Sequence, residues 1–257
     1  MAETKFPSAA PFVPAGADLD ALRRAASDCR GCHLYQDATQ TVFSRGEASA
    51  EMVMVGETPG DIEDRRGMPF VGPAGVLLRR AVGDVGLAPQ RLYLTNAVKH
   101  FKFRQAGRGQ RRIHQTPDAS EITACRPWLL AEFAQLRPKV VVVLGATAAQ
   151  ALLGPSFRVT KQRGELMPWP DSAYRPDDFP RLDTAAQVLA TLHPSAVLRA
   201  DDRETAYAGF VADLAVAAKA LDGRVHRPAS ASRAPGTGMR AEPTPLPPGG
   251  DAAPATG

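Results

Sequence analysis

Short aliphatic segments alternate with helical segments along most of this chain, and this alternation constrains its fold more than any other feature. Residues 51–56 (Glu-Met-Val-Met-Val-Gly) and 139–145 (Lys-Val-Val-Val-Val-Leu-Gly) have the composition of buried strands that end in glycine. Two further strands are predicted over 91–96 and 188–192. Strands separated by helices indicate a parallel sheet with helices on both faces. The pattern therefore predicts an α/β fold.

The helical segments between these strands have recognisable ends. Helices are predicted over residues 19–27, 72–85, 116–136, 146–153 and 203–221. In the third, Thr116 would be the N-cap, Pro117 the first helical residue and Asp118 an acidic residue of the first turn.

Polar residues follow the predicted strands. The segments are 56–60 (Gly-Glu-Thr-Pro-Gly), 96–100 (Asn-Ala-Val-Lys-His), 145–147 (Gly-Ala-Thr) and 193–195 (His-Pro-Ser). In parallel sheets ligands bind beyond the carboxyl ends of the strands, so we expect the functional site there. Each segment taken alone suits a structural turn equally well.

The two ends of the chain differ in composition from its middle. Residues 1–16 are rich in proline and alanine, and residues 223–257 contain seven prolines and six glycines. Such segments cannot offset their ordering entropy by burial, so we expect flexibility at both ends and one domain over 17–222. No secretory signal is visible, and the aliphatic run 140–144 is far below the ~20 residues that span a bilayer. We expect a cytoplasmic monomer with no membrane contact.

The chain has three cysteines, which cannot form a closed disulfide framework. Cys29 and Cys32 form a CxxC after a helical stretch, whereas a thioredoxin-type pair opens a helix after a strand. Together with Cys125 they need one more ligand for a four-coordinate site. The candidate histidines are His33, His100, His114, His193 and His226. Zinc, an iron–sulfur cluster and three unrelated cysteines all remain open on this evidence.

Seven motifs occur in order over about residues 27–215. They are CxxC, GETPG, GMPFVGPAG, TNAVKH, ACRPWL, VVVLG and LHPSAVLR. Because these motifs occur in this order, the chain resembles the family 4 iron–sulfur uracil-DNA glycosylases. Arg111-Arg112-Ile113-His114, in a Gly/Arg-rich insert, resembles the UdgX-type subgroup, which traps uracil-DNA covalently.

The resemblance implies a three-layer α/β/α sandwich with a central four-stranded parallel sheet. It also implies a [4Fe–4S] cluster held by Cys29, Cys32, His100 and Cys125, since the subgroup has histidine where most family members have a fourth cysteine. The cluster would brace the loop between His100 and Cys125 rather than take part in redox chemistry.

The resemblance also implies how uracil would be bound once it has left the base stack. Phe70 would stack on the base, and the Asn96 amide would hydrogen-bond to N3 and O4. Backbone groups of Gly56, Thr58 and Gly60 would approach the substrate. Thr58 stands where the subgroup usually has glutamine.

Three residues are the predicted catalytic groups. Glu57 would stabilise positive charge at C1′ or activate a nucleophile, and His193 would donate a hydrogen bond to uracil O2. His114 would attack C1′ after glycosidic cleavage and stay bonded to the DNA. Gln110 replaces the lysine usual in the subgroup.

DNA contacts are predicted in two segments, although the net charge of the chain is only +4. Between residues 99 and 117 there are six cations and no acidic residue, with Phe101 and Phe103 interleaved. The cations are Lys99, Lys102, Arg104, Arg108, Arg111 and Arg112. Ser195 to Arg199 resembles a loop that enters the minor groove, with Leu198 as the wedge and Arg199 at a phosphate.

Three functions follow from these residues. We expect a uracil-DNA glycosylase that cleaves uracil from single- or double-stranded DNA and becomes covalently linked through His114. The alternatives are a hydrolytic, multiple-turnover glycosylase and a non-catalytic iron–sulfur DNA-binding module. Such a module would not need Glu57, Asn96 and His193 together.

Overall fold

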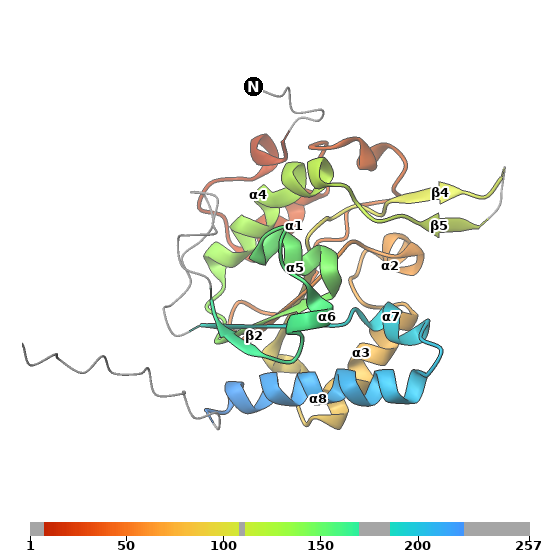
Figure 1. The fold of residues 1–257 in the computed structure, drawn as a ribbon. Coiled ribbons are helices and arrows are strands. Elements are labelled where there is room, and N and C mark those ends of the chain that lie inside the picture. Colours follow the sequence, from red (N-terminus) through yellow and green to blue (C-terminus); the bar gives the residue numbers. More distant parts are fainter. Residues whose placement is uncertain (1–7, 108–110, 170–185, 224–257) are drawn as a thin grey trace, which may run out of the picture. The chain divides into compact units, whose positions relative to one another are not determined.

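The computed structural model describes residues 8–107, 111–169 and 186–223 (Figure 1). Contacts divide the chain into a unit over Met1–Val225 and a second unit over His226–Gly257. The second unit lies outside the described ranges, and so do residues 1–7. The flexibility predicted for residues 1–7 and the disorder predicted for residues 224–257 therefore stay predictions.

The centre of the first unit is a six-stranded sheet in the order β1-β3-β2-β6-β8-β7. Its strands are β1 Ser44–Arg45, β3 Leu92–Asn96, β2 Met52–Gly56, β6 Val140–Leu144, β8 Gln187–Thr191 and β7 Leu166–Pro168. The four inner strands are parallel, and the short β1 and β7 pair antiparallel at the two edges. The α/β sandwich with four parallel strands is thus confirmed, and the structure adds the two edge strands.

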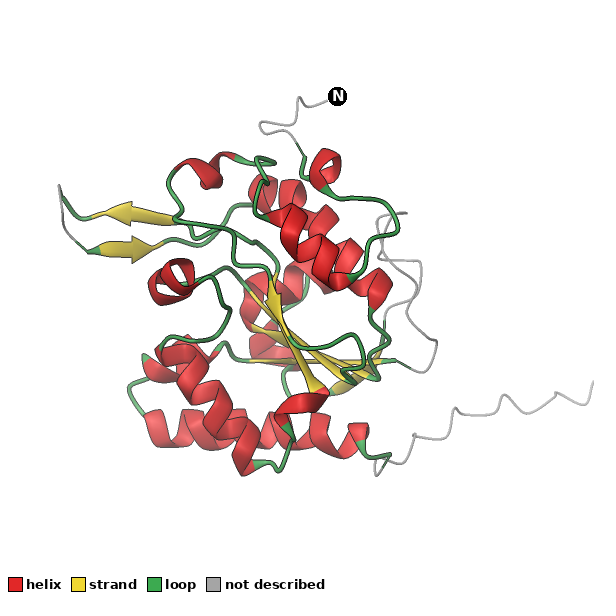
Figure 2. Ribbon diagram, turned by 180° about the vertical axis from the view of Figure 1, so that it is seen from behind, coloured by secondary structure: helices red, strands yellow, loops and turns green. Residues whose placement is uncertain are grey.

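Two helical layers cover the sheet (Figure 2). One face carries α1 Leu19–Ala26, α4 Ala119–Gln135 and α5 Gly145–Leu153, and the other carries α3 Pro73–Asp84, α7 Pro194–Leu198 and α8 Arg203–Leu221. In β2, Val53 and Val55 enter the first core while Met52 and Met54 enter the second. Burial on both faces explains why the strands are continuously apolar rather than alternating.

The remaining elements are short. They are α2 Asp61–Arg66, α6 Val159–Gln162, the 3₁₀ turns η1 Ala10–Phe12, η2 His33–Gln36 and η3 Pro89–Arg91, and the strands β4 Phe103–Gln105 and β5 Arg112–His114. Strands β4 and β5 form an antiparallel hairpin that extends away from the sheet beside α2 (Figure 1). No helix within the described ranges is long and apolar enough to cross a membrane.

The start of α4 differs from the sequence prediction. Asp118, not Thr116, is the N-cap: its carboxylate accepts the Glu121 amide at 3.0 Å, and the Glu121 carboxylate accepts the Asp118 amide at 2.7 Å. This reciprocal capping box satisfies two amides that a helix start leaves unpaired. The helix therefore begins at Ala119.

The segment just before α1 is also more ordered than its composition predicts. Ala9 is 1% exposed, and its amide donates to the carbonyl of Ala124 at 2.8 Å. It lies against Gly31, where an added Cβ would approach the Ala9 Cα to 2.6 Å. Ala9 is thus held against the domain, because Ala9 and Gly31 are small enough to allow a close backbone approach.

Candidate functional site

Three of the predicted substrate-binding residues converge beyond the ends of β2 and β3. Gly56 pairs with Asn96 in the parallel ladder. A Cβ at Gly56 would lie 2.3 Å from Asn96 Oδ1 and 2.8 Å from Phe70 Cζ. Glycine at this position therefore lets the amide and the aromatic ring come together.

The backbone of Phe70 is held in an unusual conformation. Its φ of 55° is the only positive value among the described non-glycine residues. The Phe70 carbonyl accepts Arg79 Nη1 at 2.8 Å, and Gly75 approaches so closely that a Cβ there would be 1.8 Å from the same carbonyl oxygen. Conformations of this kind persist where surrounding contacts enforce them, and they gather at functional sites.

His193 is oriented by the start of α7. The Ser195 amide donates to His193 Nδ1 at 3.2 Å, so Nδ1 carries a lone pair and Nε2 carries the proton of the neutral ring. Burial lowers the pKa of His193 to about 4, and Arg199 and the protonated form of His114 act in the same direction. Near pH 7 the ring is therefore neutral, with Nε2–H as its hydrogen-bond donor.

Gly145, at the end of β6, makes room for this histidine. Its φ is +87°, and an added Cβ would lie 2.9 Å from His193 Cβ. The Phe70 and His193 ring centroids are 6.5 Å apart. The base-binding and catalytic residues predicted from three different segments thus share one site.

The Glu57 carboxylate has two unlike oxygens. Oε2 accepts the Thr147 hydroxyl at 2.6 Å. Oε1 is buried, has no hydrogen-bond partner among the described residues, and lies 3.9 Å from His114 Nε2. Thr147 was not predicted as a site residue, although it ends the 145–147 segment already marked as a strand end.

His114 ends β5 and faces Glu57. Its side chain is 46% exposed, and its ring centroid lies 6.0 Å from that of Phe101. Desolvation lowers the pKa of His114, the Glu57 carboxylate raises it, and Arg199 lowers it. Because the balance is a lowered pKa, the imidazole is neutral near pH 7.

Arg112, predicted to bind DNA, forms contacts within the protein that fix the hairpin, and its DNA contact stays a prediction. The side chain is 12% exposed and forms ion pairs with Asp61 and, at 2.6 Å, Asp64. Its guanidinium also lies 5.2 Å from the ring centroid of Phe101 and 4.9 Å from that of Phe103. The carboxylates of Asp61 and Asp64 already neutralise the positive charge of Arg112 that would attract a DNA phosphate.

Lys99, also predicted to contact DNA, lies in the interior of the domain. Lys99 is completely buried and donates to Glu132 Oε2 at 2.5 Å. Lys102 is 22% exposed and pairs with Glu121 at 2.8 Å. Phe101 is 1% exposed, so it cannot be a platform for a base. Local composition showed the cations but not the acidic partners that α2 and α4 supply.

The other predicted DNA contacts differ in their surroundings. Arg111 and Arg199 are exposed, and Ser195 and Leu198 are half-buried on α7. Arg108 lies outside the described residues, as does Gln110. The DNA-binding roles of these residues stay predictions.

Thr58 and Gly60 serve the loop after β2. The Thr58 hydroxyl donates to the His100 carbonyl at 2.7 Å, so it ties two strand ends together and is not free to donate to a substrate. Gly60 is the N-cap of α2, where a Cβ would lie 2.7 Å from Glu63 Oε2. The Glu63 carboxylate accepts the Gly72 amide at 2.8 Å and thereby holds the loop that carries Phe70.

Comparison with known proteins identifies the family. The model of the uracil DNA glycosylase superfamily matches residues 43–215. The chain belongs to this superfamily. It is 32% identical to a type-4 uracil-DNA glycosylase of Sulfurisphaera tokodaii over 70% of this chain and 76% of that protein. The type-4 enzymes of Thermotoga maritima and Archaeoglobus fulgidus are 33% and 32% identical over 66% and 70% of this chain, and over 78% and 83% of their own lengths.

In this superfamily member, the three cysteines are free and buried in one region of the core. Three N–H groups point at two of the sulfurs: Trp128 Nε1 and the Gly31 amide lie 3.2 and 3.5 Å from Cys29, and the Lys99 amide lies 3.3 Å from Cys125. Burial raises the pKa of Cys32 to about 11 and that of Cys125 to about 12. Buried thiols with amide donors at their sulfurs suit a cationic metal group that would deprotonate them.

The hydrogen bonds around His100 leave one of its ring nitrogens with a free lone pair. The Thr41 hydroxyl donates its proton to the Ala26 carbonyl at 2.7 Å and lies 2.9 Å from His100 Nε2. Since that proton is already used, Nε2–H must donate to Thr41, and Nδ1 keeps its lone pair. Burial lowers the pKa of His100 to about 4, which favours this neutral form.

The donor atoms of this region are thiol sulfurs and one imidazole nitrogen, both of which occur as ligands of iron–sulfur clusters. Within the described part of the superfamily domain, no three Cys, His, Asp or Glu side chains converge to hold one metal ion.

Proposed function

We propose that this superfamily member excises uracil from DNA and then forms a covalent bond between His114 Nε2 and C1′ of the deoxyribose. The observation that carries the proposal is the 3.9 Å distance between His114 Nε2 and the unpartnered Glu57 Oε1. A neutral imidazole beside a carboxylate combines a nucleophile with a group that stabilises positive charge.

Uracil recognition follows from the converging side chains. The flipped base would stack on Phe70, with the Asn96 amide donating to O4 and accepting from N3–H. Cytosine presents the reverse pattern at these two positions, so a fixed amide rejects it. His193 Nε2–H would donate to O2, where negative charge develops as the base leaves.

The bonds change in two steps. First the C1′–N1 bond breaks, its electron pair leaves with uracil, and Glu57 stabilises the positive charge on the sugar. The His114 Nε2 lone pair then forms a bond to C1′, and the resulting imidazolium loses its Nδ1 proton to water. The uracil anion takes a proton from water. Tethering gives the imidazole a high effective concentration relative to water.

We further propose that Cys29, Cys32, His100 Nδ1 and Cys125 hold a [4Fe–4S] cluster. The bound cluster would act as a structural brace. Its ligands enclose the segment 100–125, which contains the β4–β5 hairpin and His114. The purified protein should be brown and contain about four iron atoms per chain. Cys32→Ala should lose the colour, whereas a colourless protein that contains zinc would overturn this assignment.

The trapping reaction can be tested on a denaturing gel. The protein mixed with uracil-containing single-stranded DNA should give a band shift that survives heat and SDS and requires uracil. His114→Ser should abolish the shift while abasic DNA still forms. A shift that persists in this variant would show that another residue is the nucleophile.

The same gel separates the two alternatives. Abasic DNA without a shift in the wild-type protein would indicate a hydrolytic enzyme that turns over many times. DNA binding with neither product would indicate a non-catalytic module.

A further inference from the structure

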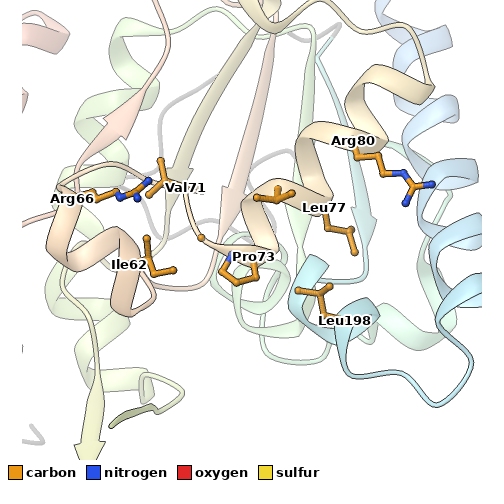
Figure 3. Close-up of a pocket in the computed structure, with 9 residues that line it drawn as sticks. Ile62, Arg66, Val71, Pro73, Leu77, Arg80 and Leu198 are labelled. Atoms are coloured by element: carbon orange, nitrogen blue, oxygen red, sulfur yellow. The ribbon is translucent and has the colours of Figure 1, made fainter.

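A pocket of about 570 Å³ opens between α2, α3 and α7 (Figure 3). Its apolar wall includes Ile62 of α2, Pro73, Val76 and Leu77 of α3, and Leu198 of α7. The volume lies within the range of pockets that bind small organic groups, ~300–1,000 Å³. None of the residues that line it is acidic.

The apolar surface of the domain is unusually exposed here. Within the described ranges, the exposed large apolar side chains are Ile62 at 37%, Met68 at 45% and Val76 at 56%. Ile62 and Val76 line the pocket, and Met68 lies on the loop between them. Exposed apolar side chains that gather in one place indicate a binding surface.

Two arginines border this apolar surface. The Arg66 side chain is exposed and reaches toward Val71 in Figure 3, and it has no ion pair among the described residues. Arg80 is held at 4.7 Å over the Tyr207 ring. An aromatic base against the apolar wall, with its phosphate at Arg66, would match this combination of charges and surface.

The pocket adjoins the proposed uracil site at two points. Val71 directly follows Phe70, the predicted stacking residue. Leu198 ends the short helix that begins directly after His193. A DNA strand that places its uracil between Phe70 and His193 would therefore carry its neighbouring nucleotide to this pocket.

We propose that the pocket binds the base of a nucleotide adjacent to the flipped uracil on the same strand, with Arg66 contacting its phosphate. This inference rests on the proposed function, because the uracil site sets the position of the strand. Binding of a neighbouring base would explain why the surface beside the uracil site is apolar, since a surface that contacts only phosphates would not need apolar side chains.

The test removes one base at a time from single-stranded DNA with a single uracil. A tetrahydrofuran residue, which keeps the backbone but lacks the base, replaces the nucleotides one and two positions to each side. Removal on one side should weaken binding about 5- to 100-fold, as expected for loss of one stacked base. Fluorescence anisotropy gives binding, and single-turnover assays give excision.

The variant Val76→Asp tests whether this loss of binding arises at the pocket. The Val76 side chain is exposed, so the fold should tolerate the change. In this variant, removal of the base that matters in the wild-type protein should weaken DNA binding less than threefold, because the contact with the pocket is already lost. Arg66→Ala should weaken binding more than Arg65→Ala, a matched control whose side chain pairs with Asp61 at 3.1 Å.

The outcomes distinguish this inference from the proposed function. If uracil is excised but no base removal changes binding, the pocket assignment is wrong and the function stands. If Val76→Asp weakens every substrate equally, its effect is general repulsion and the assignment is again wrong. If no uracil is excised yet one base removal weakens binding only when Val76 is intact, the pocket is correct and the function is wrong.

Discussion

At the scale of single residues, the two oxygens of Glu57 determine what the site can do. Thr147 fixes Oε2 at 2.6 Å, and the carboxylate plane then turns the unpartnered Oε1 toward His114. A buried polar atom without a hydrogen bond costs ~1–3 kcal/mol. Thr147 is therefore a positioning residue. Without its hydrogen bond to Oε2, the Glu57 carboxylate would rotate until Oε1 found a hydrogen-bond partner.

Thr147→Val should separate positioning from chemistry. The variant keeps the side-chain shape and removes the hydroxyl, so Glu57 can rotate away from His114. We expect a fall of about tenfold or more in the rate of covalent trapping, measured in single-turnover reactions, and a changed pH profile. Thr147→Ser, which keeps the hydroxyl, should restore both. Equal rates in the Val variant and the wild-type protein would show that Thr147 does not position Glu57.

At the scale of elements, the β4–β5 hairpin carries the proposed nucleophile. Each strand has only three residues, and a two-stranded hairpin alone is marginally stable. Arg112 stabilises it by its ion pairs with Asp61 and Asp64 of α2 and by stacking on Phe101 and Phe103. One cation of the basic segment thus serves to place His114.

Arg112→Gln should therefore release the hairpin. We expect the ratio of trapped to excised uracil, read from one denaturing gel, to fall at least tenfold, because water reaches C1′ when His114 is displaced. Arg111→Gln is the matched control: this side chain is exposed, so its loss should weaken DNA binding and leave the ratio unchanged. A similar fall in both variants would indicate a general charge effect.

The same elements show how far sequence patterns reach. The core strands and four of the five predicted helices agree with the structure within one or two residues, because apolar runs and caps are local signals. The burial of Lys99 was not predictable, because its partner Glu132 is 33 residues away on α4. Thr147 and Asp64 were missed for the same reason. Their roles depend on which strand ends and helices become neighbours.

At the scale of the whole domain, a buried neutral histidine connects the site to stability. His193 has a pKa of about 4 in the folded protein, lowered mainly by burial, against an ordinary value of 6.5. As pH falls through 6.5, the unfolded chain binds a proton at this ring while the folded domain does not. The stabilising contribution of the neutral ring is complete above 6.5 and is lost between 6.5 and about 4.

Equilibrium unfolding in urea should reveal this dependence. Titration of His193 should lower the free energy of unfolding of the wild-type protein by on the order of 2 kcal/mol between pH 7 and pH 4.5. His193→Gln replaces the ring by a side chain that does not titrate, so the variant should lose less free energy over the same interval, whatever its stability at pH 7. An equal loss in both proteins would mean that His193 is as accessible to protons in the folded domain as in the unfolded chain. The neutral Nε2–H donor assigned to this ring would then lose its physical basis at mildly acidic pH.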